Sequence, residues 1–171
     1  MKIDFTAQKP VCLLLLCGWL LFPALFFAQT TYLYCGQIIP VSGPAQSGVT
    51  LVIENNRIAR IENGYSKAPA NAIVIDLKSK TILPGLIDCH VHFEFEQNRN
   101  SYNERFLLND ADIAYHAAVY ARRTLEAGFT TVRDLGGTGV NIALRNAINT
   151  GWVAGPRIIT AGKALSITGG H

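Results

Sequence analysis

The stretch GLIDCHVHF, residues 85–93, decides how this chain is interpreted, because it holds two of the four histidines in 171 residues. The run is short and mostly apolar, as in a strand buried on both faces of a parallel sheet. The polar segment EFEQNRNSYNERF, residues 94–106, follows it directly. The histidines therefore lie where a buried strand gives way to a loop, which is where parallel barrels place their active-site groups.

On a strand, residues i and i+2 share a face and stand about 6.5 to 7 Å apart along the chain, at roughly 3.3 Å per residue. His90 and His92 should therefore point the same way, close enough to share one metal ion, while Cys89 and Val91 pack on the other face. The alternative is two loop histidines that bind nothing, since an H-x-H pair alone is a weak signal.

The residues after Pro84 alternate between strand-like and helix-like patterns. The predicted strands are 85–93, 129–135 and 156–162, with helices at 109–127 and 140–151, and LSITGGH at 165–171 as a strand or strand end. An order of β, α, β, α, β predicts parallel strands joined by crossover helices.

Residues 31–83 are predicted to form short strands without evident chemistry. The clearest signal is a hairpin over residues 48–64, with a tight turn at Asn55-Asn56 between two runs of apolar residues. Further strands are expected at 32–40 and 72–77.

Residues 1–28 have the pattern of a secretory signal peptide. Lys2 and Lys9 precede the apolar block VCLLLLCGWLLFPALFFA, residues 11–28, and Ala28 is a small residue suited to cleavage. The block is nearly long enough for an uncleaved membrane anchor, which stays an alternative, and a lipoprotein signal at Cys17 is disfavoured. We expect a secreted or periplasmic protein, with membrane contact if the segment is retained.

Composition excludes some classes of function. Charge is nearly balanced, with 15 basic against 12 acidic residues, and no basic run or basic–aromatic interleaving suggests a nucleic-acid surface. Outside residues 1–28 only Cys35 and Cys89 remain, which is no disulfide framework. They could pair in an oxidising compartment, but two buried apolar thiols are favoured.

Four segments together resemble a known family. PGLIDCHVHF (84–93), TTVRDLGG (130–137), GPRII (155–159) and SITGGH (166–171) are similar to the amidohydrolase superfamily, in its imidazolonepropionase-like and Xaa-Pro dipeptidase (prolidase)-like branch. The resemblance covers nearly all of residues 31–171. It implies an α/β fold, with a small β-sandwich at 29–84 and the first βαβαβ part of an incomplete TIM (β/α)8 barrel at 85–171.

The resemblance also implies a chemistry. In this superfamily the H-x-H pair of the first barrel strand ligates metal, so His90 and His92 become the expected ligands of one or two divalent ions, with Zn²⁺ favoured. A metal on imidazoles lowers the pKa of bound water to about 7 and polarises carbonyl groups. The implied reaction is hydrolysis of a C–N bond in a small amide, cyclic amide or dipeptide.

Other polar residues are candidates for supporting roles. His171 is a candidate for substrate binding, and Asp88 and Asp134 are candidates for hydrogen bonding behind the metal ligands. Strand-start capping is the alternative for Asp88, and a loop N–H or an ion pair with Arg133 is the alternative for Asp134. Glu94 and Glu96 are expected to be solvated loop carboxylates, and His116 a surface or packing histidine of a helix.

The region after Pro84 is far shorter than the ~250 residues of a closed barrel. A catalytic zinc also takes three protein ligands plus water, and two histidines are too few. We therefore expect the N-terminal part of a larger enzyme, with residues 1–171 alone showing no measurable hydrolysis. No catalytic residue is assigned within them. The alternative is a non-catalytic remnant or binding module. Substrate, metal identity and oligomeric state, including a homo-oligomer, stay open.

Overall fold

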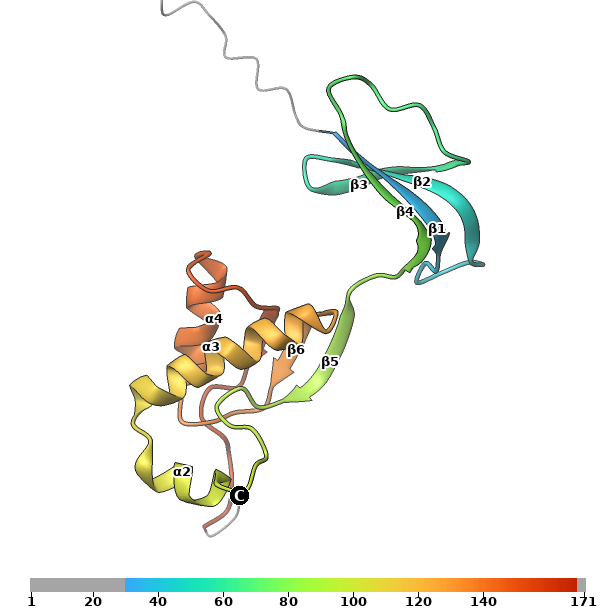
Figure 1. The fold of residues 1–171 in the computed structure, drawn as a ribbon. Coiled ribbons are helices and arrows are strands. Elements are labelled where there is room, and N and C mark those ends of the chain that lie inside the picture. Colours follow the sequence, from blue (N-terminus) through green and yellow to red (C-terminus); the bar gives the residue numbers. More distant parts are fainter. Residues whose placement is uncertain (1–29, 169–171) are drawn as a thin grey trace, which may run out of the picture. The chain divides into compact units, whose positions relative to one another are not determined.

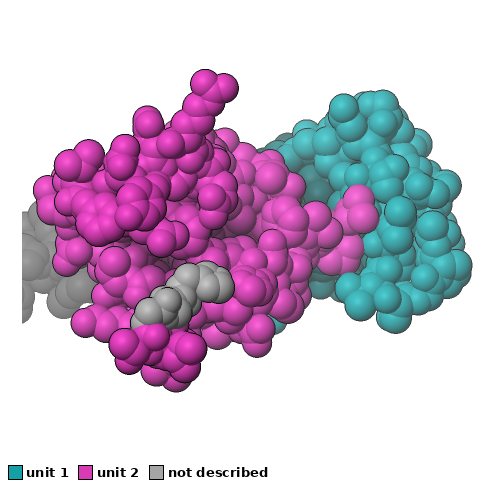
Figure 2. Space-filling view, turned by 90° about the horizontal axis from the view of Figure 1, so that it is seen from below, with its two compact units in different colours: residues 1–82 teal, residues 83–171 magenta. Residues whose placement is uncertain are grey.

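The computed structural model describes residues 30–168. Contacts divide the chain into two compact units, with the boundary between Ile82 and Leu83, and Figure 2 colours them separately. The predicted signal peptide at 1–28 and His171 lie outside the described residues. Among the described helices, none is both long and apolar enough to cross a membrane.

The first unit is a four-stranded sheet in the order β3-β2-β1-β4 (Figure 1). Its strands are β1 (Thr31–Ile38), β2 (Gln46–Glu54), β3 (Arg57–Asn63) and β4 (Ile73–Ile82). Neighbours β1 and β2, and β2 and β3, are antiparallel, whereas β1 and β4 run parallel. The described residues of this unit form one sheet, and its place in a β-sandwich stays a prediction.

The hairpin β2–β3 forms as predicted. Asn55 and Asn56 have φ values of 51° and 60°, the left-handed conformation that a two-residue hairpin turn requires. One face of the sheet is buried around Cys35, Ile38 and Val49. Strand β4 runs on to Ile82, past the predicted end at residue 77, because Thr81 and Ile82 pair with β1 again after a register shift.

The second unit holds a parallel sheet in the order β5-β6-β7. The strands are β5 (Leu86–Val91), β6 (Phe129–Asp134) and β7 (Arg157–Thr160), with crossover helices α3 (Asp110–Glu126) and α4 (Val140–Asn149). Helix α3 packs on β6, and α4 packs on β7 and α3. The predicted β, α, β, α, β alternation is confirmed.

Local signals at the ends of α3 were sufficient to place it. The Asn109 side chain accepts hydrogen bonds from the N–H groups of Ala111 and Asp112, and the Asp112 carboxylate accepts one from the N–H of Asn109. This reciprocal cap satisfies donors that a helix start leaves free. At the other end Gly128 takes a φ of 99°, which suits a glycine after a helix.

Two predictions for this unit were wrong in detail. The segment 94–106, expected as a polar excursion, holds all but the last residue of a short helix, α2 (Ser101–Leu107). Residues 165–168, expected as strand or strand end, have no regular structure. The last β-type pairing of this segment is an isolated bridge between Lys163 and Gly137, in the loop after β6. The described residues after Lys163 have no β-type pairing.

The prediction that β5 is buried on both faces was also wrong. Leu86 and Ile87 are 46% and 66% exposed, and Cys89 is an exposed free thiol, whereas the free thiol of Cys35 is buried as predicted. Within the described residues β5 is an edge strand, paired to β6 alone, so nothing there covers its outer side. Val91 does pack against the core of this unit.

Candidate metal site

A β-bulge ends strand β5. Cys89 and His90 together face Arg133, where a regular ladder would place one residue. The Arg133 side chain donates from Nε to the Cys89 carbonyl oxygen at 2.9 Å, which holds the bulge. Arg133 is therefore engaged with β5, and the predicted alternative of an ion pair with Asp134 is not formed among the described residues. Bulges bend a strand and re-aim its side chains.

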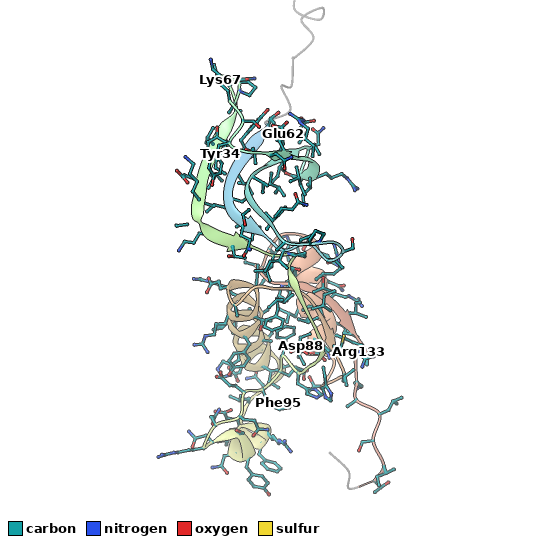
Figure 3. The ribbon with its side chains drawn as sticks, turned by 90° about the vertical axis from the view of Figure 1, so that its right-hand side faces the viewer. Tyr34, Glu62, Lys67, Asp88, Phe95 and Arg133 are labelled. Atoms are coloured by element: carbon teal, nitrogen blue, oxygen red, sulfur yellow. The ribbon has the colours of Figure 1, made fainter. Side chains whose placement is uncertain are left out.

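Asp88 supports the same bulge. Its carboxylate accepts a hydrogen bond from the backbone N–H of His90 at 2.9 Å. Figure 3 shows Asp88 and Arg133 near the end of β5, with Phe95 beyond it. Asp88 thus shapes the backbone at a candidate ligand, and within the described residues it makes no hydrogen bond to an imidazole.

The rings of His90 and His92 lie close together. Their centroids are 5.4 Å apart, with an angle of 69° between the ring planes. Both rings line one cavity of about 540 Å³. The His92 ring also stacks on Phe95, with 5.3 Å between centroids and 22° between planes. The two imidazoles therefore face a common space, as sharing one cation requires.

A hydrogen bond orients the His92 ring. Its Nδ1 lies 2.8 Å from the carbonyl oxygen of Gly136, in the loop after β6. A carbonyl oxygen can only accept, so Nδ1 carries a proton, and in the neutral tautomer that this contact selects Nε2 has the lone pair. Metal-binding histidines are typically held in this way, by an oxygen that fixes the tautomer.

Asp134 holds the backbone on both sides of that hydrogen bond. The fully buried carboxylate accepts from the N–H of Phe93 at 3.0 Å and from the N–H of Gly136 at 2.9 Å. It also accepts from the Asn141 side chain at 2.9 Å. Of the roles predicted for Asp134, the structure shows binding to loop N–H groups, which places His92 and its acceptor side by side.

Glu94 is the residue that sequence reasoning placed wrongly. It was expected to be solvated, but it is 8% exposed. Its carboxylate accepts from the N–H groups of Thr138, Gly139 and Asn141 at 2.5, 3.3 and 2.9 Å, at the start of α4. A Cβ at Gly137 would overlap this carboxyl group, so a larger residue there would push the carboxylate away from the N–H groups that it binds.

One sequence signal could have located Glu94. The first turn of a helix leaves several N–H groups without partners, and a Ser, Thr, Asp or Asn at the N-cap normally binds some of them. The N-cap of α4 is Gly139, which has no side chain to do so. The Thr138 hydroxyl accepts only from the N–H of Val140, at 3.4 Å, so the N–H of Asn141 takes its acceptor from elsewhere, and an acidic residue suits the positive end of a helix.

The remaining candidates lie apart from the histidine pair. Glu96 is exposed and lies 3.7 Å from Arg123 in a surface ion pair. His116 is exposed on α3, the first of the two positions predicted for it, surface or packing. The substrate-binding role of His171 stays a prediction, because that residue is outside the described range.

The imidazoles of His90 and His92 suit a divalent cation as two members of its ligand set. Two neutral imidazoles are good ligands for Zn²⁺, and a catalytic zinc takes three protein ligands and water. No group of three or more His, Cys, Asp or Glu side chains with metal-binding geometry occurs among residues 30–168. Glu94 and Asp134 are not spare ligands, because both carboxylates bind N–H groups. The described residues thus fit two positions of such a site.

Comparison with known proteins shows the family. The model of the amidohydrolase family matches residues 81–170, more than half of the chain, and the chain belongs to this family. The family predicted from the motifs is confirmed, and with it the interpretation of the second unit as the first part of a TIM barrel.

Relatives of this chain include known hydrolases. Ochratoxinase of Aspergillus niger is 33% identical over 147 residues, which cover 84% of this chain and 30% of ochratoxinase. The structure of a Xaa-Pro dipeptidase with bound methionine is 40% identical with a TM-score of 0.75, covering 84% of this chain and 36% of the dipeptidase. A prolidase complexed with N-methylphosphonate-L-proline is 36% identical with a TM-score of 0.71, and the match covers 84% of this chain and 34% of the prolidase. The chain spans about a third of these proteins.

Proposed function

We propose that the full-length protein is a metal-dependent hydrolase of C–N bonds in which His90 and His92 are two of the metal ligands. The observation that carries this proposal is the pair of imidazoles 5.4 Å apart at the end of the first barrel strand. Family membership and the hydrolases among the relatives support it. The chemistry that a bound divalent cation supplies is acidification of water to a pKa of about 7 and polarisation of a carbonyl oxygen.

The chain's own residues prepare the ligands. The Gly136 carbonyl holds the proton of His92 on Nδ1, so that Nε2 is available without any change of tautomer. Phe95 stacks on one face of the same ring, which restricts its rotation and covers that face from water. Zn²⁺ is favoured, although imidazoles also accept iron, nickel and copper.

The cavity supports a small substrate with a carboxylate. Its volume of about 540 Å³ is in the range of small-molecule sites. Arg105 of α2 lines it beside the two histidines, and no ion pair among the described residues engages its guanidinium. Arginine binds carboxylates through paired hydrogen bonds. We therefore propose an amide with a free carboxylate, such as a dipeptide or an N-acyl amino acid.

Export is a separate proposal that rests on the sequence of residues 1–28. Lysines followed by an apolar block support a signal peptide, with the protein secreted or periplasmic. N-terminal sequencing of the mature protein tests it: a start near Gln29 supports cleavage, and an intact N-terminus supports a membrane anchor.

The ligand role is tested with the full-length double variant His90→Ala, His92→Ala. Because both proposed imidazoles are removed, metal bound per protein and hydrolysis of a dipeptide series should both fall to background. The matched control is His116→Ala, an exposed histidine on α3, which should keep both. Metal content is measured by mass spectrometry after gel filtration. Stoichiometric metal in the double variant would exclude the proposed ligands.

The substrate class is tested with Arg105→Gln in the full-length protein. A hydrogen bond to a charged group contributes about 1.5–3 kcal/mol, so KM for a cleaved dipeptide should rise about 10- to 100-fold. The same dipeptide with its carboxylate converted to an amide should be cleaved equally by wild type and variant. Arg99→Gln, an exposed residue of the same segment that does not line the cavity, is the control. Equal losses on both substrates would contradict a carboxylate-binding role.

A further inference from the structure

The three residues that directly follow β5 bind one loop. His92 does so through its ring, Phe93 through its backbone N–H, and Glu94 through its carboxylate. All three contacts go to residues 134–141, the connection from β6 into α4. These hydrogen bonds hold residues 92–94 against residues 134–141, and the His92 ring is part of this contact.

Glu94 binds the part of this loop that leads into α4. Its carboxylate oxygens accept from N–H groups 44 to 47 residues away in sequence, so Glu94 is a long-range cap of α4. Among the side chains of the loop, only the Thr138 hydroxyl accepts from a backbone N–H at the start of the helix, that of Val140 at 3.4 Å, and Gly139 has a φ of 114° that a side chain would adopt with strain. Capping by Glu94 instead couples the start of α4 to the segment that carries His92.

We propose that Glu94 is a positioning residue for His92, an inference that rests on the proposed ligand role of that histidine. By holding the loop of residues 136–141, Glu94 keeps the Gly136 carbonyl against Nδ1 of His92 and so leaves Nε2 ready for the cation. Asp134 holds the residues next to the bond, because it accepts from the N–H groups of Phe93 and Gly136. Glu94 holds the later part of the loop, at the start of α4.

A carboxylate suits this role better than a neutral group. It offers two oxygens to three N–H donors, and its negative charge lies at the positive end of α4. Glutamine keeps the length of the side chain, but its NH₂ group would face N–H donors, so one of the two acceptors is lost. Alanine removes both acceptors and leaves the loop without this partner.

The test uses Glu94→Gln and Glu94→Ala in the full-length protein, with two readouts that do not depend on turnover. The first is the tautomer of His92 in the metal-free protein, read from long-range ¹H–¹⁵N spectra of the imidazoles. Wild type should show the Nδ1–H form, and the variants a mixture. The second is the Kd for Zn²⁺, which should rise about 10- to 100-fold, as for loss of other residues behind metal ligands.

Two controls separate positioning from general effects. Gly151→Ala weakens α4 at its other end, because Gly151 has a φ of 78° that alanine adopts with strain. It should lower the urea midpoint without changing the His92 tautomer or the Kd for Zn²⁺. Glu96→Gln removes a neighbouring carboxylate that is exposed, and should change none of the three quantities.

The outcomes are distinguishable. If Glu94→Gln and Glu94→Ala lose stability but keep the wild-type tautomer and Kd, Glu94 is a helix cap alone and the inference is overturned. If Glu94→Ala does not fold, Glu94→Gln decides by the same criteria. If wild type binds no Zn²⁺, the proposed function fails, and the tautomer measurement alone then decides whether Glu94 orients His92.

Discussion

The candidate site depends on one hydrogen bond, from Nδ1 of His92 to the carbonyl oxygen of Gly136. It joins the end of β5 to the loop after β6, two segments that are 44 residues apart in sequence. Without it the imidazole could hold its proton on either nitrogen, and the ring could rotate. Either change would weaken the binding of a cation by His92. Because a carbonyl oxygen only accepts, this one contact selects both the tautomer and the ring orientation.

The surrounding fold maintains that bond through buried carboxylates. Asp134 and Glu94 cross between the same two segments in opposite directions, one from the end of β6 to β5 and the other from β5 to the start of α4. Buried carboxylates are tolerated where several donors satisfy them, and here each receives three hydrogen bonds. The polar cluster therefore gives the strand ends a fixed spacing that apolar packing alone would not specify.

Sequence reasoning predicted the elements whose signals are local. The Asn55-Asn56 turn, the cap at Asn109 and the strand–helix alternation after Pro84 follow from short-range patterns, and the motifs identified the family. The bulge at Cys89-His90 and the capping by Glu94 depend on partners more than 40 residues away, which periodicity does not reveal. The exposure of β5 was missed for a similar reason, because burial is set by neighbouring strands.

The most direct measurement is a crystal structure of the full-length protein loaded with zinc, with diffraction data collected on both sides of the zinc absorption edge. The account predicts an anomalous peak about 2.0–2.1 Å from a ring nitrogen of His90 and from Nε2 of His92, with Nδ1 of His92 still bonded to Gly136. A metal bound through Nδ1 of His92, or a peak distant from both rings, would contradict it.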